Sequence, residues 1–244
     1  MLITIITVCY NSEKTIGKTL DSIDRQSFKG YEHIIIDGKS TDRTLEIISR
    51  GSSENRVVRS EPDNGLYDAM NKGLSWAKGD YIFFLNSDDY LSNKDVLKRV
   101  ARDIKMGMAD ILLYSIEYFG DGFSRKWILK ENKGYLPTPY FVPPHPGFIV
   151  SRDLIIALEL RFDLKYKICA DMKFMLEGLQ ASSKNILTSD LILTRMRSGG
   201  LSSKFLSRRI KEFYLIYRDL GYSTIQAFEF ILRRYTRKFV QFVI

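Results

Sequence analysis

Acidic side chains follow several predicted strands of this chain, at the point where each apolar run ends. Asp88 and Asp89 come just after the run 81–85, and Asp37 comes directly after the run 33–36. Clustered carboxylates repel each other unless a cation or a ligand rich in hydrogen-bond donors neutralises them. Adjacent carboxylates suit Mg²⁺ or Mn²⁺, which prefer oxygen ligands and typically also bind phosphate oxygens. The pattern predicts a cation that bridges a diphosphate, and an ordinary Asp-Asp turn is the alternative.

Asp171 is the residue best suited to act as a catalytic base. It opens a predicted helix over residues 171–179. The positive end of a helix dipole stabilises an ionised carboxylate, so this side chain is expected to be ready to accept a proton at neutral pH. An ordinary helix N-cap, for which aspartate is a favoured residue, is the alternative interpretation.

Other polar residues are weaker candidates for ligand contacts. His145 lies in a proline-rich segment, where contact with a ligand and a structural role are both open. Arg195 or Arg197 could close over a diphosphate as part of a lid, although solvated arginines are the alternative. The common phosphate-binding motifs are excluded, because no GxGxxG follows the first strand and His33 stands where a P-loop needs glycine.

Strand and helix patterns alternate through the first half of the chain. Apolar runs rich in β-branched residues predict strands at 2–8, 33–36, 57–58 and 81–85, and helical spacing of apolar residues predicts helices at 13–23, 42–48, 67–77 and 96–104. This alternation predicts a mostly parallel sheet with helices on both faces. Ligands of such sheets bind beyond the carboxyl ends of the strands, where the acidic residues lie.

The pattern changes in the second half. Segments 111–119 and 123–129 flank Gly120 and Gly122, which predicts a hairpin. Five of the six prolines fall within 137–146, which predicts a long loop or a linker. A strand at 148–150, a helix at 171–179, a strand at 186–193 and a flexible joint at 198–203 follow.

The composition excludes several classes of protein. With 45% hydrophobic and 27% charged residues in 244, the chain is neither disordered nor fibrous. Two cysteines and two histidines exclude a disulfide scaffold, a thiolate zinc site and a His-rich metal site. We expect a protein of the cytoplasm, since no leader-like segment precedes the short apolar start. The net charge is +8, and residues 204–244 hold nine basic and three acidic residues.

Five motifs occur in an order and spacing that resemble a known family. They are Thr7-Val8-Cys9-Tyr10-Asn11, Asp37-Gly38-x-Ser40-Thr41-Asp42, Glu61-Pro62-Asp63-x-Gly65, Tyr67-Asp68-Ala69-Met70-Asn71-Lys72-Gly73 and Asn86-Ser87-Asp88-Asp89. Together they resemble glycosyltransferase family 2, the inverting nucleotide-sugar enzymes of GT-A fold, and most of all bacterial transferases of O-antigen, capsule or colanic-acid synthesis. The resemblance covers about residues 1–200. It implies a GT-A domain over 1–203, followed by a basic helical tail over 204–244.

The resemblance also implies roles for individual residues. Thr7, Tyr10 and Asn11 would border the nucleotide, and Asp37 would accept a hydrogen bond from the base. The donor site would further include Ser40, Asp68, Asn71, Ser87, His145 and Arg197. Asp88 and Asp89 would hold Mn²⁺ or Mg²⁺, with the main ligand left open between them, and Asp171 would be the base. Met70 replaces the arginine of relatives, and Asn86 replaces the first aspartate of the DXD motif.

The basic tail predicts contact with an anionic surface. From Thr224 onward, apolar residues recur at intervals of three and four, with basic residues between them: Phe228, Ile231, Leu232, Tyr235, Phe239, Phe242 and Val243 form the stripe. Such a helix fits a membrane interface, and packing on its own domain or in a homodimer is the alternative. The prediction is a peripheral protein at the inner face of the plasma membrane.

The function expected from the sequence is therefore transfer of a hexose or N-acetylhexosamine. The donor would be a nucleotide sugar, UDP-linked rather than GDP-linked, and the acceptor a lipid-linked saccharide of surface polysaccharide synthesis. A non-catalytic nucleotide-sugar sensor is an alternative, and it would bind ligand without needing Asp171. A nucleic-acid binder that uses the basic tail is a third class, and no recognised reading motif supports it.

Overall fold

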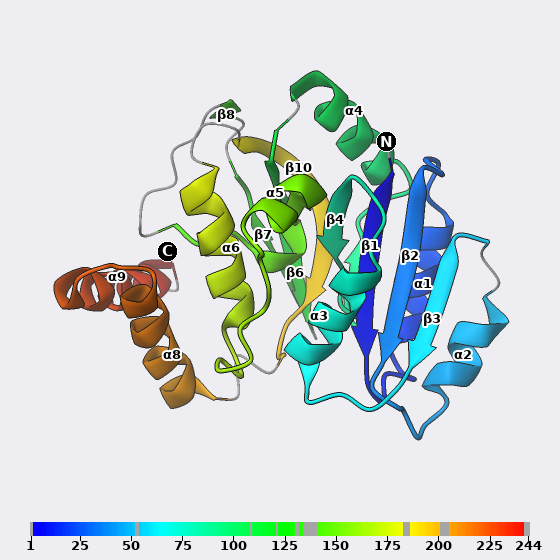
Figure 1. Ribbon diagram of the computed structural model, residues 1–244, viewed down its shortest axis with the longest axis horizontal. Coiled ribbons are helices and arrows are strands. Elements are labelled where there is room, and N and C mark those ends of the chain that lie inside the picture. Colours follow the sequence, from blue (N-terminus) through cyan, green and yellow to red (C-terminus); the bar gives the residue numbers. More distant parts are fainter. Residues whose placement is uncertain are drawn as a thin grey trace.

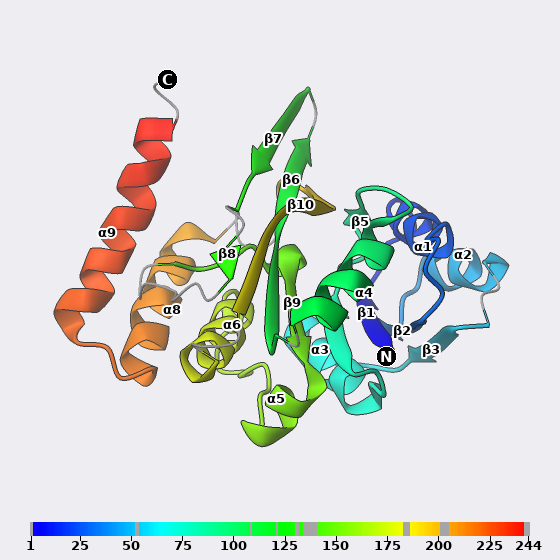
Figure 2. The same ribbon diagram turned by 90° about the horizontal axis from the view of Figure 1, so that it is seen from above.

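The computed structural model describes residues 2–51, 54–107, 109–120, 122–129, 132–133, 141–182, 186–200 and 205–241. Within these residues the strands form one sheet in the order β3-β2-β1-β4-β9-β6-β10-β5, with β7 paired to β6 and β8 paired to β10. The strands are β1 (Ile3–Cys9), β2 (Tyr31–Asp37), β3 (Arg56–Ser60), β4 (Tyr81–Phe84), β5 (Tyr90–Leu91), β6 (Ile111–Gly120), β7 (Phe123–Trp127), β8 (Asn132–Lys133), β9 (Phe148–Ser151) and β10 (Ile186–Arg197). Helices stand on both faces of this sheet (Figures 1 and 2).

The N-terminal part of the sheet is parallel, as the alternating pattern predicts. β1 pairs in parallel with β2 and β4, and β2 pairs in parallel with β3. The strands that follow pair in both directions, because β9 is antiparallel to both β4 and β6 while β10 is parallel to β6. The predicted α/β fold class is confirmed, with a mixed sheet in its second half.

Two layers of helices cover the sheet and explain why every residue of β1 is buried. One face carries α1 (Ile16–Asp24), α2 (Thr44–Arg50) and α4 (Val96–Gly107); the other carries α3 (Leu66–Trp76), α5 (Arg152–Ala157) and α6 (Ala170–Ala181). Successive side chains of a strand point to opposite faces. Ile5 accordingly packs in the cluster that contains Val100 of α4, and Ile6 in the cluster that contains Met70 of α3. Gly73 lets α3 approach β1 closely, since a Cβ there would lie 2.5 Å from Ile6.

The second half contains the predicted hairpin and some elements that the sequence analysis missed. β6 and β7 pair antiparallel next to Gly122, which has a positive φ of 79°. The predicted helix 171–179 is α6, and the predicted strand 186–193 is the first part of β10. The short α5 was not predicted, although Ser151 caps it by accepting a hydrogen bond from the Leu154 N–H at 3.3 Å. β5 and β8, each of two residues, are too short to show a pattern.

The proline-rich segment falls partly outside the described residues, since 134–140 are not among them. Its last part is ordered as η1 (His145–Gly147), a single 3₁₀ turn that leads into β9. Gly147 is required there because a Cβ would lie 2.2 Å from the carbonyl oxygen of Tyr114. This turn places His145 beside Phe84, the last residue of β4, with the two ring centroids 5.9 Å apart.

Two helices complete the described chain: α8 (Leu206–Asp219) and α9 (Thr224–Gln241). Phe213, Ile216 and Tyr217 of α8 pack in the same core cluster as α6, and Ala227 and Phe230 of α9 join them. In Figure 2, α8 lies between α9 and α6. Across the described residues, no helix combines the length and the apolar character that crossing a bilayer requires.

Candidate active site

The parallel strands bring the predicted donor-site residues to one edge of the sheet. Cys9 pairs with Asp37, and Asp37 pairs with Ser60, so β1, β2 and β3 end level with one another. β4 ends beside β1, where Phe84 pairs with Ile6. The loops after these strands form the lower edge of the sheet in Figure 1.

Asp37 is the centre of a buried hydrogen-bond network at this edge. Its carboxylate accepts hydrogen bonds from the Ser40 backbone N–H at 3.0 Å, the Ser60 hydroxyl at 2.7 Å and the Ser40 hydroxyl. The Cys9 thiol lies 3.6 Å from the same carboxylate. Burial, with the charge of Asp37, raises the pKa of this thiol, which is therefore not a nucleophile. Asp37 joins the ends of three strands, and a direct contact with a base stays a prediction.

A second carboxylate, Asp63, lies on the outer side of this edge. Its Oδ2 would be 2.5 Å from a Cβ at position 38, so Gly38 leaves the space that the Asp63 side chain fills. Tyr10 lies beside them and is 63% exposed. Asn11 holds a left-handed conformation (φ 49°), and its side-chain oxygen accepts a hydrogen bond from the Thr41 N–H at 2.9 Å. Tyr10, Asn11 and Asp63 therefore lie together at a surface that a ligand can reach.

Thr7 and Asn71 are engaged in contacts within the protein. The buried Thr7 hydroxyl lies 3.0 Å from Nε2 of His33. The Asn71 amide makes two hydrogen bonds of 2.8 Å to the backbone of Phe162, one from its nitrogen and one to its oxygen. Asp68 accepts a hydrogen bond from the Asn64 N–H at 2.9 Å. The structure thus gives these side chains a role in holding loops, and their ligand contacts stay predictions.

The Asp88–Asp89 pair contains carboxylate oxygens that could act as ligands of a cation. Asp89 is buried, and burial together with the charge of Asp88 raises its pKa well above the usual value. Its Oδ1 accepts a hydrogen bond from the backbone N–H of Arg197 at 2.9 Å, but its Oδ2 has no hydrogen-bond partner among the described residues. The side-chain oxygen of Asn86 is likewise buried without a partner. Buried polar atoms are almost always satisfied, so these oxygens are available to bind a cation, a ligand group or water.

A hard divalent cation fits these residues, because it prefers oxygen ligands and neutralises two adjacent carboxylates. In the described part of the chain, no group of three or more His, Cys, Asp or Glu side chains gathers in a metal-binding arrangement. A cation at Asp88 and Asp89 must therefore take further ligands from water or from a phosphate group. The Ser87 and Ser12 hydroxyls are hydrogen-bonded at 2.9 Å. This contact connects the loop of Asp88 and Asp89 to the segment that leads into α1.

Asp171 lies in the first turn of α6, and its carboxylate is held from α3. The Tyr67 hydroxyl is 3.0 Å from Asp171 Oδ1 and 2.7 Å from the carbonyl oxygen of Ile168, and it can donate to either. The N-cap residue of α6 is Cys169, and its side chain makes no capping hydrogen bond. Asp171 is therefore not an ordinary N-cap. Burial and the Asp171 charge raise the pKa of Tyr67 well above its usual value, so Tyr67 stays a donor.

His145 is partly buried and packs between aromatic rings. Its ring stacks at 5.9 Å on Phe84 and meets Phe162 edge-on at 6.4 Å. Burial lowers the pKa of the imidazole, which is therefore neutral at pH 7. Its Nε2 atom is buried without a partner. The structure gives His145 a packing role, and contact with a ligand stays a prediction.

The two arginines proposed for a lid lie in different environments. Arg195 makes an ion pair of 2.8 Å with Glu117. The backbone of Arg197 donates to Asp89, and its positive charge acts on Asp88. Arg197 is thus the arginine of the two that the structure brings to the acidic pair.

One residue of this region, Glu212 of α8, was missed by the sequence analysis. Its buried carboxylate accepts hydrogen bonds from three successive backbone N–H groups, those of Lys167, Ile168 and Cys169, at 2.9–3.0 Å. These residues lead directly into α6 and Asp171. A lone glutamate within a basic, amphipathic segment carries no sequence signal for such a role.

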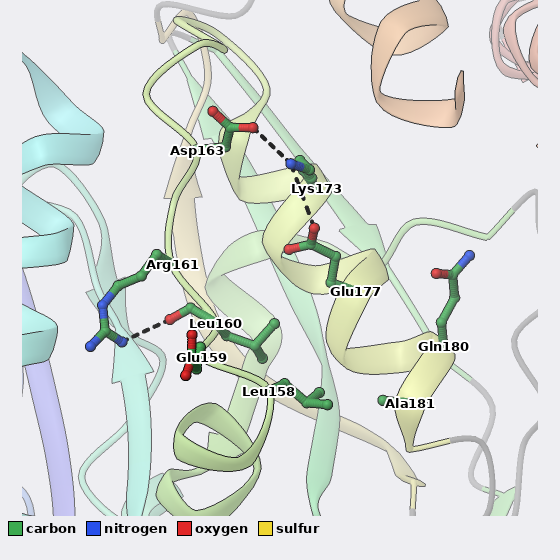
Figure 3. Close-up of a pocket in the computed structure, with 9 residues that line it drawn as sticks. All are labelled: Leu158, Glu159, Leu160, Arg161, Asp163, Lys173, Glu177, Gln180 and Ala181. Carbon is green, nitrogen blue, oxygen red and sulfur yellow. Dashed lines mark hydrogen bonds and ion pairs between the residues drawn. The ribbon is translucent and has the colours of Figure 1, made fainter. Parts of the chain in front are cut away.

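A surface hollow of about 650 Å³ lies on another side of α6 and contains none of the candidate site residues. Figure 3 shows Lys173 there, 2.7 Å from Asp163 and 3.6 Å from Glu177. Residues two apart on a helix point about 200° away from each other, so Lys173 and Asp171 face opposite sides of α6. This hollow is therefore separate from the acidic site.

The sequence has relatives among known proteins. Residues 4–158 match the family described as Glycosyl transferase family 2. A PGL/p-HBAD biosynthesis glycosyltransferase of Mycobacterium tuberculosis (strain ATCC 25177 / H37Ra) is 38% identical over 183 residues, which cover 71% of this chain and 68% of the relative. The poly(ribitol-phosphate) beta-N-acetylglucosaminyltransferase TarS of Staphylococcus aureus (strain MW2) is 26% identical over 238 residues, 93% of this chain and 41% of TarS.

Solved structures share the fold. TarS 1-349 of S. aureus in complex with UDP-GlcNAc matches with a TM-score of 0.76 and 24% identity, over 88% of this chain and 65% of that chain. The mannosyltransferase PcManGT from Pyrobaculum calidifontis, in complex with GDP-Man and Mn²⁺, matches with a TM-score of 0.69 and 15% identity, over 89% and 63%. The chain spans less than two-thirds of the length of these solved chains. The likeness confirms the expected GT-A fold.

Proposed function

Because this chain belongs to glycosyltransferase family 2, we propose that it transfers a hexose or N-acetylhexosamine from a nucleotide sugar to a saccharide acceptor, with inversion at the anomeric carbon. The observation that carries the proposal is the packing between the elements that bear the two acidic groups. The ring of Phe84, at the end of the strand before Asp88, lies 6.1 Å from the ring of Phe174 on the helix of Asp171. A candidate cation site and a candidate base therefore stand on directly packed elements.

The base in this proposal is Asp171. Its carboxylate accepts the proton of an acceptor hydroxyl while that oxygen bonds to the anomeric carbon and the bond to the nucleoside diphosphate breaks. A single displacement of this kind inverts the anomeric carbon. The Tyr67 hydroxyl, 3.0 Å from Asp171 Oδ1, can donate to this oxygen and so orient the carboxylate.

Asp88 and Asp89 are the residues that we assign to Mn²⁺ or Mg²⁺. A cation bound there supplies positive charge for the leaving diphosphate. The unpartnered oxygens of Asp89 and Asn86 support this assignment. Arg197, whose charge acts on Asp88, is placed to add to the positive field around the same phosphates.

The donor nucleotide that we favour is UDP, and GDP is the alternative. Solved structures of the TarS relative are described with UDP and with UDP-GlcNAc, whereas that of PcManGT is described with GDP-Man. The proposed donor contacts are Tyr10, Asn11, Ser40, Asp68, Ser87 and Arg197, of which Tyr10, Asn11 and Arg197 are exposed and Ser87 is buried. Thr7, Asp37, Asn71 and His145 are proposed to support those loops from behind, because their side chains already make contacts within the protein or are buried.

The acceptor that we propose is a lipid-linked saccharide of surface polysaccharide synthesis, reached at a membrane surface. Three apolar side chains of α9 support contact with such a surface: Ile225 is 78% exposed, Phe228 60% and Leu232 64%. Their spacing of three and four residues aligns them along one side of the helix. The opposite side of α9, with Ala227 and Phe230, packs on α8. The ring of Phe228 also lies 5.4 Å from that of Tyr214 of α8, so this side chain is in contact with α8 while 60% of it is exposed.

Release of the nucleotide diphosphate tests the proposed reaction. The full chain is incubated with Mn²⁺, a panel of UDP- and GDP-sugars and an extract of bacterial lipid-linked saccharides. We expect release with one nucleotide class, and loss of at least 100-fold in kcat for Asp171→Asn with UDP affinity nearly unchanged. The matched control is Asp153→Asn, an exposed aspartate in the first turn of α5. Binding of UDP without any release of nucleotide would favour a non-catalytic binding protein. Full activity of Asp171→Asn would favour another residue as the base.

A further inference from the structure

Two aromatic side chains, Tyr118 of β6 and Trp127 of β7, lie side by side on the β6–β7 hairpin. Their ring centroids are 6.3 Å apart and their planes are inclined by only 20°. Both side chains are partly buried, so each keeps part of its surface exposed. In Figure 2 this hairpin projects from the rest of the sheet. Neither ring belongs to the proposed donor, cation or base residues.

The pair faces the side of the sheet that carries α6. Trp127 packs against the core cluster that contains Phe174 of α6. Successive side chains of a strand point to opposite faces. Phe119 of β6 accordingly points to the other face, where its ring lies 5.1 Å from that of Tyr90. The stacked pair is therefore on the face that carries the helix of the proposed base.

The end of β6 stands next to the acidic pair. Phe119 pairs with Arg197 of β10, and the backbone N–H of Arg197 donates to Asp89 Oδ1 at 2.9 Å. Tyr90, whose ring contacts Phe119, follows Asp89 directly in the sequence. Tyr118 immediately precedes Phe119, so the aromatic pair begins one residue from the strand position that is joined to the proposed cation site.

The same stretch of β6 contacts the elements around the proposed base. Ile116, which pairs with Trp127 across the hairpin, lies against η1, because a Cβ on the last residue of this turn would be 3.2 Å from the Ile116 side chain. His145 of η1 meets Phe162 edge-on at 6.4 Å. Phe162 in turn stacks at 5.7 Å on Tyr67, the residue whose hydroxyl is 3.0 Å from the carboxylate of the proposed base. The stretch that carries the aromatic pair is thus linked by packing to both acidic groups.

The order of the strands puts the pair on the acceptor side of the donor. The proposed nucleotide contacts follow β1 and β2, the acidic pair follows β4, and β6 comes after β4 and β9 in the sheet. A nucleotide sugar that extends from β1 and β2 to a cation at Asp88 and Asp89 would therefore point its sugar toward β6. In a single displacement the attacking hydroxyl approaches from the side opposite to the leaving diphosphate. The hairpin lies on that side.

We propose that Tyr118 and Trp127 form an acceptor subsite that stacks on a pyranose ring, so that the attacking hydroxyl belongs to a cyclic sugar and not to an open-chain alditol. This inference rests on the proposed transfer reaction and adds the chemical class of the acceptor. The faces of aromatic rings are apolar and carry partial negative charge, which suits the C–H groups on the face of a pyranose. An open-chain alditol has no rigid apolar face, so it gains little from such a contact.

The chain has two tryptophans, Trp76 and Trp127, which makes the subsite directly observable by fluorescence. Trp76 lies on α3, where the guanidinium of Arg59 is 4.1 Å from its ring, so Trp76→Phe leaves Trp127 as the only reporter. This protein, with UDP and Mn²⁺ present, is titrated with methyl pyranosides of glucose, galactose, mannose, rhamnose and N-acetylglucosamine, and with ribitol 5-phosphate. We expect at least one pyranoside to change the Trp127 emission saturably, with an affinity at least fivefold higher than that of ribitol 5-phosphate.

Variants of the second ring test the stacking itself. In the Trp76→Phe background, Tyr118→Leu removes a ring and should weaken pyranoside binding at least fivefold, whereas Tyr118→Phe keeps the ring and should bind as its parent does. The matched control is Trp127→Phe, which keeps an aromatic ring in the subsite and leaves Trp76 as the only tryptophan. Its emission should not respond to any of the sugars.

Several results would overturn the subsite. They are the lack of a saturable change with every pyranoside, equal affinity for ribitol 5-phosphate, and an equal response from Trp76. Unchanged affinity in Tyr118→Leu with unaltered thermal melting would do the same. A tenfold loss of UDP-GlcNAc affinity in Tyr118→Leu would also overturn it, by assigning the ring to the donor. The titration of the Trp76→Phe protein leaves the subsite intact, so it decides the proposal even if Tyr118→Leu does not fold.

The outcome is distinguishable from that of the test of the reaction. Pyranoside binding at Trp127 by a protein that releases no nucleotide would leave the subsite standing and refute the transfer. In an active enzyme, Tyr118→Leu should raise the acceptor KM at least fivefold and leave the donor KM near its wild-type value. An active Tyr118→Leu variant with an unchanged acceptor KM would refute only the subsite.

Discussion

The carboxylate of Glu212 in α8 accepts a hydrogen bond from the backbone N–H of Cys169, 2.9 Å away, at the residue that precedes α6. The N–H groups of Ile168 and Lys167 bind the same carboxylate. Hydrogen bonds to a buried charged group are stronger than neutral ones and are costly to lose. A side chain of the C-terminal helices therefore fixes the turn from which Asp171 projects.

Glu212→Gln should lower both stability and turnover. The amide cannot accept three N–H groups as the carboxylate does, and its own NH₂ group would face backbone donors. We expect the free energy of unfolding to fall by about 1–3 kcal/mol. If Glu212 positions Asp171, kcat should fall about tenfold while the KM for the donor stays near its wild-type value. Denaturant unfolding and steady-state kinetics measure the two effects.

The control for this prediction is Glu229→Gln, which changes a partly exposed glutamate of α9 that pairs with Arg233. Surface pairs of this kind contribute little, so this variant should unfold and turn over like the wild type. A Glu212→Gln protein that is destabilised but keeps its kcat would show that the glutamate stabilises the fold without positioning the base.

Much of the parallel half of the fold can be predicted from the sequence, because its signals are local. The continuous apolar runs of β1 and β2 and the acidic residues that follow the strands are visible without any knowledge of partners. Local signals also marked Asp88 and Asp89 after a strand and Asp171 at the start of a helix as site residues, and their shared site stays a prediction. The contact between Glu212 and Cys169 joins residues 43 apart, and no periodicity predicts such a pairing.

Other parts of the site escaped prediction for a similar reason. Asn71 falls within a motif, yet its amide bonds to the backbone of Phe162, 91 residues away, instead of standing free. The apolar stripe of the tail predicts one amphipathic face, but Ala227 and Phe230 turn inward whereas Phe228 and Leu232 turn outward. A helix with apolar residues on two sides can pack and present a surface at once, and only the tertiary contacts distinguish the sides.

Activity should depend on a divalent cation. EDTA should remove at least nine-tenths of nucleotide release, and Mn²⁺ or Mg²⁺ should restore it, because the leaving diphosphate needs positive charge. Asp88→Asn and Asp89→Asn should each weaken the Mn²⁺-dependent part of UDP binding about tenfold or more. Asp21→Asn, at an exposed aspartate paired with Arg25, is the control and should bind as the wild type does. Full turnover in EDTA would contradict the metal assignment.

His33 should make the protein less stable as the pH falls. Burial and the neighbouring Arg56 lower the pKa of His33 to about 3, whereas an unfolded histidine has a pKa of about 6.5. The unfolded chain thus binds a proton that the folded chain does not, and the free energy of unfolding falls as the pH drops from 6.5 toward 3 by up to about 1.4 kcal/mol per pH unit. Above pH 6.5 this dependence disappears.

His33→Gln tests this effect, because glutamine retains a donor toward the Thr7 hydroxyl and cannot be protonated. Urea unfolding at pH 7.5, 6.5, 5.5 and 4.5 should give a flatter decline for the variant than for the wild type, whatever its stability at pH 7.5. His145, the other histidine of the sequence, remains in both proteins and cancels in the comparison. Parallel declines would assign the acid sensitivity to other groups.

The exposed apolar stripe of α9 should control association with anionic membranes. Replacing Ile225, Phe228 and Leu232 with serine removes apolar area that is mostly exposed, together with one ring contact between Phe228 and Tyr214 of α8, so the fold should survive while membrane affinity falls. Basic residues near an anionic surface contribute about 1 kcal/mol each, so binding should also weaken as salt rises. Co-sedimentation with phosphatidylglycerol vesicles should capture the wild type, and vesicles of phosphatidylcholine alone should capture much less. Ile156→Ser on α5, at a side chain that is 57% exposed, is the matched control and should bind normally. Equal binding to both vesicle types, or a triple variant that still sediments with vesicles, would show that the stripe serves another contact. If the wild type is a dimer and the triple variant is a monomer, that contact is with a second copy of the chain.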